Sequence, residues 1–246
     1  MTSSKEQAIV LVHGAWHGGW CYGRVADLLR AAGHRVYVPT LTGLGERSHL
    51  LTRSINLSTH ITDITNLIRW EEIQNLILVG HSYGGIVVTG VADAMTDRVS
   101  ALVYLDAFLP TAGKSFHDVL PTEVADAQIR GASASNGLSV PPIPAAAFNV
   151  NEADRLWVDS LCTPHPLGTL TQPIELTGSY ARIASKSYVL ATKNPIQLFQ
   201  GFARSMRNDR SCTSYELPCG HDVMIDFPNE TAAIIEEATA RAFAGS

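Results

Sequence analysis

The stretch Val79-Gly80-His81-Ser82-Tyr83-Gly84-Gly85 decides the fold of this chain and carries the first sign of its chemistry. The apolar residues 76–79 lead into it, and the weakly polar residues 86–95 follow it. This order predicts a strand, a very tight turn and a helix, with glycines where side chains would collide with neighbouring backbone. The spacing G-x-S-x-G is typical of a turn that holds a serine above the end of a sheet, beside the positive end of a helix. Ser82 is therefore the candidate nucleophile.

Continuous apolar segments recur along the chain, and they predict the strands of a buried sheet. The expected strands cover residues 8–12, 35–38, 76–79, 99–105, 187–191 and 213–217. Segments with helical spacing lie between them, so we expect an α/β fold with a mostly parallel, six-stranded sheet covered by helices on both faces. Ser58 is the expected N-cap of the helix before the third strand. Pro228 is expected near the start of the last helix, capped by Asp226 or Asn229.

The alternation of strands and helices stops between residues 110 and 185. Prolines cluster there, clear strands disappear, and short helical pieces are expected near residues 121–130 and 145–161. We interpret this segment as a cap or lid inserted over the end of the sheet. The expected organisation is a core made of residues 1–109 and 186–246, with residues 110–185 as the cap.

Composition excludes several classes of partner. The chain has 246 residues, 46% of them hydrophobic and 17% charged, with a formal net charge of -5 and no block of Lys or Arg. Nucleic acid and anionic membranes are therefore not expected partners. The four cysteines form no C-x-x-C pair, and neither a signal peptide nor an apolar run near twenty residues is evident. We expect a cytoplasmic protein; the oligomeric state stays open, with a dimer as one option.

A serine hydroxyl needs a base within hydrogen-bond reach, and His221 is the candidate. It lies in the loop after the last expected strand, between Gly220 and Asp222. In sheets with such a serine turn, the order along the chain is serine, acid, histidine. His13 also follows a strand but precedes the nucleophile. His81 lies inside the turn, and its side chain is expected to point away from Ser82.

The acid that orients the base is the hardest residue to assign. The loop after the penultimate strand, residues 192–197, is its usual place but contains no carboxylate. Asp106 stands at the carboxyl end of the strand that follows the serine helix, and by elimination it is the predicted acid. The alternative is that Asp106 is only a turn residue and that Asn194 orients His221 as a neutral acceptor.

An oxyanion hole requires two backbone N–H groups. One is expected from Tyr83, the residue after the nucleophile. The other is expected from the glycine-rich loop after the first strand, with Ala15 as the choice and Trp16 next. No spacing calls for a metal, since His13 and His17 lie on a loop and not on a helix, and no phosphate-binding glycine pattern predicts a cofactor.

At this point the chain resembles the compact α/β-hydrolases that include plant methylesterases, plant hydroxynitrile lyases and related bacterial esterases. Within that group it is most similar to bacterial esterases such as those that hydrolyse the benzimidazole carbamate carbendazim. The resemblance spans nearly the whole chain. It rests on residues 13–21, 41–47, 80–85, 102–108 and 219–224. It implies the α/β-hydrolase fold and serine hydrolase chemistry.

Two departures bear on the choice between subfamilies. The lyases have a threonine where this chain has Gly14, and a lysine directly after the histidine where this chain has Asp222. Their cyanide chemistry depends on that positive charge, so the resemblance favours an esterase. The second departure is Asn194, which occupies the usual position of the family's acid.

The sequence thus predicts a serine carboxylesterase that cleaves small esters or carbamates through an acyl-enzyme. A hydroxynitrile lyase-like enzyme and a small-molecule receptor with a near-idle triad are the alternatives. The cap is expected to supply the walls of the substrate pocket. The candidate pocket residues are Leu138, Phe148 and Trp157 from the cap, together with Trp16 from the glycine-rich loop after the first strand. The identity of the ester, lactone or carbamate is not encoded in any motif.

Overall fold

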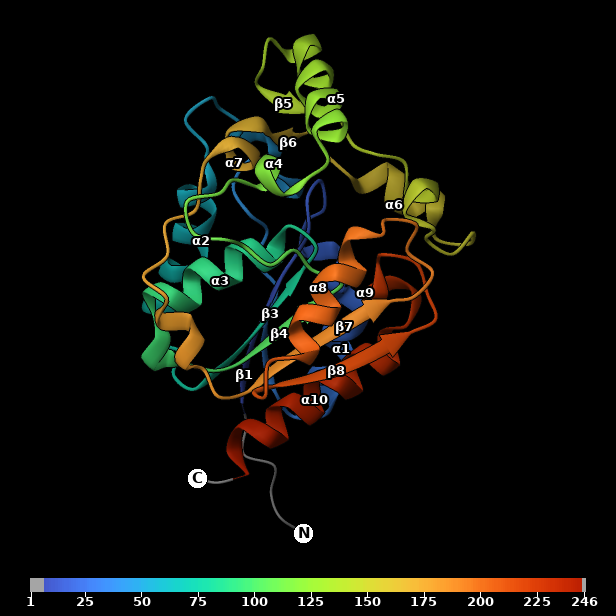
Figure 1. Ribbon diagram of the computed structural model, residues 1–246. Helices are drawn as coiled ribbons and strands as arrows, with labels where there is room; N and C mark the ends of the chain where they lie inside the picture. The colour runs from blue at the N-terminus through green and yellow to red at the C-terminus, as the bar shows by residue number, and fades with distance from the viewer. Residues whose placement is uncertain (1–6, 245–246) are drawn as a thin grey trace.

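A computed structural model describes residues 7–244 of the chain, and its centre is a six-stranded sheet (Figure 1). The strand order is β2-β1-β3-β4-β7-β8, and every neighbouring pair is parallel. The strands are β1 (Ala8–Val12), β2 (Arg35–Tyr37), β3 (Leu76–His81), β4 (Val99–Leu105), β7 (Lys186–Ala191) and β8 (Cys212–Leu217). All six predicted strands are confirmed, with bounds that differ by no more than two residues.

Helices cover both faces of the sheet because each strand is apolar on both faces. Helices α2, α3 and α8 lie on one face, and α1 and α10 pack together on the other (Figure 1). Their bounds are α1 (Gly23–Ala31), α2 (Leu57–Trp70), α3 (Gly84–Ala94), α8 (Leu198–Arg207) and α10 (Pro228–Phe243). A short helix that the sequence did not predict, α9 (Val223–Asp226), follows the loop of His221. Among the described residues, no helix combines the length and apolar character that crossing a membrane requires.

Two predicted helix caps are wrong. Asn56, not Ser58, is the N-cap of α2, where its side chain accepts from Thr59 N–H in a capping box. Phe227 precedes α10 without any side-chain cap, although Pro228 does occupy the first turn. The carboxylate of Asp226 instead accepts hydrogen bonds from Gly220 N–H and from Asn151. It therefore secures the loop that carries His221.

Residues 116–171 lie over the carboxyl ends of the strands, at the top of Figure 1, and the rest of the segment up to residue 185 returns past α3 to the start of β7. Residues 110–185 form four short α-helices, three short 3-10 helices and one pair of two-residue strands, although we expected no strands here. The α-helices and strands are α4 (Phe116–Val119), α5 (Thr122–Ala132), β5 (Ser139–Val140), α6 (Arg155–Leu161), β6 (His165–Pro166) and α7 (Leu167–Thr171). We propose that this segment acts as the cap of the core.

The topology concentrates loops at one place. The strand order reverses between β1 and β3, since β2 lies on one side of β1 and all later strands lie on the other. Such a reversal leaves a crevice at the carboxyl ends of the strands. Val12 pairs with Gly80 and His81 with Leu105, so the loops after β1, β3 and β4 emerge side by side.

Candidate active site

The turn after β3 holds Ser82 in a conformation that few residues other than glycine adopt. Its φ is +52°, in the left-handed region. A Cβ at Gly80 would lie 2.7 Å from the Gly84 carbonyl oxygen, and one at Gly84 would lie 2.6 Å from the Val12 carbonyl oxygen. Both positions therefore require glycine. Strained backbone of this kind concentrates at functional sites, and here it lifts the Ser82 hydroxyl beside the start of α3.

Ser82, His221 and Asp106 form one hydrogen-bonded row. His221 Nε2 lies 2.9 Å from Ser82 Oγ, and His221 Nδ1 lies 2.7 Å from Asp106 Oδ2. All three side chains are buried, and Asp106 is itself held at a φ of +42°. The arrangement can take a proton from the hydroxyl and hold the resulting imidazolium against a carboxylate.

Asn194 touches both partners of this row. Its Nδ2 lies 2.5 Å from Asp106 Oδ2 and 3.1 Å from His221 Nδ1, while its Oδ1 accepts from Ile196 N–H. Ala191 N–H donates to the other carboxylate oxygen of Asp106. The sequence presented Asp106 and Asn194 as alternatives, whereas the structure brings both to the imidazole.

The two expected oxyanion donors flank the serine. Neither Ala15 N–H nor Tyr83 N–H donates a hydrogen bond to any part of the chain between residues 7 and 244. Trp16 N–H, the second choice, instead donates to His165 Nδ1 at 3.2 Å. The free N–H of Ala15 therefore fits the role better than that of Trp16.

Four fully buried histidines surround this site, and burial lowers the pKa of each. The pKa falls to about 3 for His13 and to about 4 for His60, and it lies well below the ordinary value for His81 and His165. These imidazoles are neutral, so each can act as a hydrogen-bond acceptor. His165 accepts from Trp16 N–H, and His13 Nε2 accepts from Leu41 N–H.

His17 differs because it faces Asp222. Its Nε2 lies 3.1 Å from Asp222 Oδ2, and its Nδ1 lies 2.8 Å from the Ala15 carbonyl oxygen. Burial alone would lower the pKa of His17, but the carboxylate outweighs burial and raises it. Burial likewise opposes ionisation of Asp222, yet His17 holds the pKa of that carboxyl well below its usual range. The pair ties the Ala15 loop to the residue after His221.

One group of side chains is arranged closely enough for a metal within residues 7–244. Ligand atoms of His81, His221 and Asp222 lie within 4.8 Å of one another. His221 faces Ser82 and Asp106, and Asp222 faces His17, so two of the three already serve other partners. These residues fit a hydrogen-bonded support for the serine better than a metal centre.

A cavity of about 310 Å³ opens beside Ser82 and His221. Trp16 and Phe148 line it, as the sequence predicted. Leu138 and Trp157, the other two predicted pocket residues, do not line this cavity. Leu138 directly precedes β5, and the ring of Trp157 packs against Trp20 with centroids 5.1 Å apart.

The sequence missed most of the cavity wall. Its additional apolar side chains come from the turn after β4, from the cap and from the start of α8. They are Phe108, Phe116, Leu120, Pro121, Val124, Ile143, Ile196, Leu198 and Phe199. Apolar residues at such positions are equally typical of core, so no pattern in the sequence separates lining from packing.

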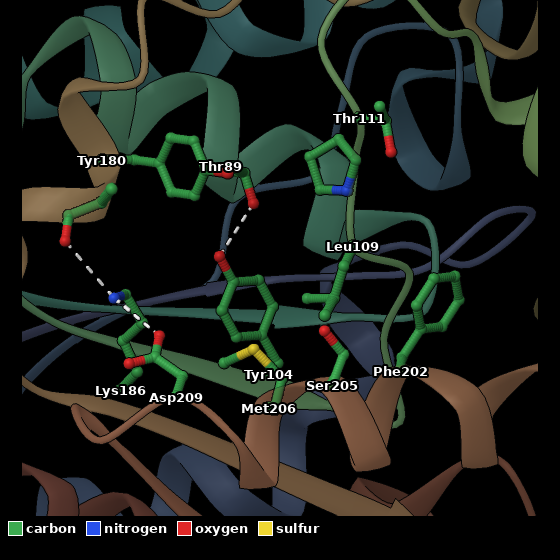
Figure 2. Close-up of a pocket in the computed structure, with 12 residues that line it drawn as sticks. Thr89, Tyr104, Leu109, Thr111, Tyr180, Lys186, Phe202, Ser205, Met206 and Asp209 are labelled. Carbon is green, nitrogen blue, oxygen red and sulfur yellow. Dashed lines mark hydrogen bonds and ion pairs between the residues drawn. The ribbon is translucent and has the colours of Figure 1, made fainter.

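A second cavity, of about 340 Å³, lies between α3 and α8 (Figure 2). Two pairs of its polar side chains bind each other. Tyr104 Oη lies 2.9 Å from Thr89 Oγ1, and Lys186 Nζ lies 3.1 Å from Asp209 Oδ2 and 2.8 Å from Ser211 Oγ. No histidine is among the described residues that line it, so its hydroxyls lack the base that Ser82 has in His221.

Comparison with known proteins agrees with this architecture. A carbendazim-hydrolysing esterase of Nocardioides sp. (strain SG-4G) is 45% identical over 231 residues, which cover 91% of this chain and 96% of the relative. Methylesterase 2 of Arabidopsis thaliana is 35% identical over 117 residues, or 43% of this chain and 41% of that protein.

Solved structures support the same fold. An extracellular alpha/beta-hydrolase from a Paenibacillus species has a TM-score of 0.82 at 24% identity, covering 96% of this chain and 98% of its own. Tomato methylketone synthase I has a TM-score of 0.78 at 20% identity, with coverages of 96% and 99%. Residues 9–234 match the model of the alpha/beta hydrolase family, and this chain belongs to that family.

Proposed function

We propose that this enzyme is a serine carboxylesterase that cleaves small esters or carbamates through an acyl-enzyme. The observation that carries the proposal is the row Ser82–His221–Asp106, which ends at the apolar cavity. Ser82 Oγ attacks the carbonyl carbon while His221 Nε2 accepts the hydroxyl proton. Asp106 stabilises the imidazolium, and the N–H groups of Ala15 and Tyr83 donate to the oxyanion.

The tetrahedral intermediate then collapses. The bond between the carbonyl carbon and the leaving group breaks, and His221 returns its proton to the departing alcohol or amine. Water next attacks the acyl-enzyme, with His221 as general base, and releases the acid and Ser82. The 45% identity to a carbendazim-hydrolysing esterase supports an ester or carbamate substrate. The apolar cavity supports a substrate with an apolar body.

Two features weigh against the lyase alternative. The position after His221 holds Asp222, whose carboxylate is paired with His17 and supplies no positive charge to the cavity. A Cβ at Gly14, where the lyases have threonine, would lie 2.8 Å from His81 Nδ1 and 2.9 Å from Ser82 Cβ. The receptor alternative is less favoured because His221 lies within hydrogen-bond distance of both Ser82 and Asp106, which supports turnover.

The proposal also covers the role of residues 110–185 and the location of the enzyme in the cell. We propose that residues 110–185 close the cavity as a cap, since Gln128, Ile143 and Phe148 from this segment line it. We also propose a cytoplasmic location, which is supported by four cysteines that form no disulfide. Nucleic acid, membrane and cofactor have no part in the proposed reaction.

The test is a Ser82→Ala variant assayed with p-nitrophenyl butyrate. We expect kcat to fall by at least about 10⁴-fold, because the nucleophile is lost while binding is kept. A fluorophosphonate should add one adduct mass to the wild type and none to the variant. Ser160→Ala, at an exposed serine of α6, is the matched control and should keep full activity. Undiminished hydrolysis by Ser82→Ala, or release of cyanide from mandelonitrile, would overturn the proposal.

A further inference from the structure

The cavity beside Ser82 has one buried polar side chain that the proposed reaction does not use. Besides Ser82 and His221, its polar lining consists of Gln128 and Gln197. Gln197 is exposed, whereas Gln128, on α5 of the cap, is only 8% exposed. A buried amide in an otherwise apolar wall costs free energy unless its groups find partners.

Only half of the Gln128 amide has a partner within the described chain. Its Oε1 lies 2.9 Å from Nε2 of His117, which stands on the neighbouring helix α4. The other ring nitrogen, His117 Nδ1, is buried without a hydrogen-bond partner among residues 7–244. An unpartnered lone pair is better tolerated there than an unpartnered N–H, so the ring proton belongs on Nε2 and is donated to Gln128. Burial also lowers the pKa of His117, which keeps the ring neutral.

This contact fixes which end of the amide is free. With Oε1 engaged by His117, the Nε2 amine of Gln128 carries two donors that no described residue accepts. An apolar ligand would leave these donors desolvated and unpaired. A ligand with an acceptor at this point would pair one of them.

We propose that Gln128 is a specificity-determining residue that selects substrates bearing a hydrogen-bond acceptor on their apolar body. The acceptor is a second carbonyl oxygen or an aromatic ring nitrogen, presented to the amine of Gln128 while the scissile carbonyl lies at Ser82. This inference rests on the proposed function, because it assigns the cavity to the substrate of that reaction. It narrows the substrate class from apolar esters to esters or carbamates of heteroaromatic or carbonyl-bearing groups.

The test compares methyl benzoate with the three methyl pyridinecarboxylates, which differ by one ring nitrogen. Dissociation constants are measured by calorimetry on Ser82→Ala, so that differences in intrinsic reactivity do not enter. The measured quantity is the affinity for each pyridine ester divided by the affinity for methyl benzoate. For one pyridine isomer we expect this ratio to be about 3- to 10-fold higher in Ser82→Ala than in the double variant Ser82→Ala/Gln128→Leu. In the enzyme with Ser82 intact, Gln128→Leu should raise KM for that isomer and lower KM for benzoate, because leucine leaves no unpaired donor against an apolar ligand.

Two further variants separate selection from a structural role. Gln128→Glu keeps an acceptor for His117 but turns an oxygen toward the cavity, so it should reject the pyridine isomer more strongly than Gln128→Leu does. His117→Phe frees the amide and should lose part of the preference. Equal changes for benzoate and all three pyridines in Gln128→Leu would mean that Gln128 only joins α4 to α5, and would overturn the inference. If the wild type hydrolyses neither p-nitrophenyl butyrate nor any of the four esters, the proposed function fails instead.

Discussion

At the scale of single residues, the tautomer of His221 decides which neighbour serves it. When Nε2 faces the Ser82 hydroxyl to accept its proton, Nδ1 must carry the ring proton and needs an acceptor. Asn194 points its amine toward this group, because its Oδ1 accepts from Ile196 N–H. An amine cannot accept, so Asp106 is the acceptor, and Asn194 donates to the same carboxylate.

Paired variants test this division of roles. Asp106→Asn should lower kcat for p-nitrophenyl butyrate by about 10³- to 10⁴-fold, since it removes the charge that stabilises the imidazolium and permits the wrong tautomer. Asn194→Ala should cost only about 10-fold, because it removes one hydrogen bond to the carboxylate. Steady-state kinetics on both variants, with melting temperatures as a check on folding, gives the comparison. A larger loss in Asn194→Ala than in Asp106→Asn would assign the orienting role to Asn194.

At the scale of elements, the sequence predicts the strands of the sheet, because burial on both faces requires them to be apolar throughout. Continuous apolar runs are sufficient to locate every strand of the sheet, and glycines mark the tight turn at Ser82. Short helices such as α9 and the elements of residues 110–185 carry no such signature, because a few residues cannot establish a period. The same limit hides the cavity wall, where Phe108 and Phe199 resemble core residues in sequence.

The N-cap of α2 was predicted at the wrong residue, and the difference can be measured. Both Asn56 and Ser58 are good N-cap residues, but only Asn56 accepts from the N–H of Thr59. Asn56→Ala should lower the free energy of unfolding by about 1 kcal/mol. Ser58→Ala should change it by less than about 0.5 kcal/mol, because Ser58 is exposed and lies inside the helix. Urea denaturation followed by circular dichroism checks both values, and equal losses would show that the side-chain cap is not the stabilising contact.

At the scale of the whole molecule, the polar side chains of the candidate site are buried within the apolar core. Residues from four strand ends, from the cap and from the last loop meet at Ser82, although Ala15 and His221 are far apart in sequence. Asp106 and His221 could be proposed from the sequence because each follows a predicted strand, and the carboxyl ends of parallel strands lie at one edge of the sheet. The supporting histidines could not, since His17, His60 and His165 acquire their roles only from contacts between distant segments.

These buried histidines should make the entire molecule sensitive to acid. His13, His60, His81 and His165 are neutral when folded, with pKa values below the ordinary 6.5 that each regains on unfolding. Between pH 6.5 and about 4 the unfolded chain therefore binds more protons than the folded one, and stability rises with pH. Each histidine contributes at most about 1.4 kcal/mol per pH unit, so four together can remove at most about 5.6 kcal/mol per unit, a large share of a typical stability. The His17–Asp222 pair does not offset this loss. The raised pKa of His17 contributes stability that is already fully present below pH 6.5 and is lost only as the pH rises. The lowered pKa of Asp222 contributes stability that is fully present at any pH above the ordinary pKa of a carboxyl. Neither contribution therefore grows as the pH falls from 6.5 to 5.

The expected result is a steep fall in the free energy of unfolding from pH 6.5 to pH 5, measured by urea denaturation at closely spaced pH values. His60→Gln provides the matched variant, because glutamine does not titrate and can still contact Thr42 and Tyr83. We expect the variant to be less stable than the wild type at pH 7. Its free energy of unfolding should depend less steeply on pH, by the amount that corresponds to one proton fewer taken up on unfolding. A wild-type stability that stays level between pH 6.5 and 5 would mean that the folded protein admits protons to these rings. The pKa of each imidazole, followed by NMR of its ring protons, would then lie near 6.5, and neutral burial would not be what organises the interior around Ser82.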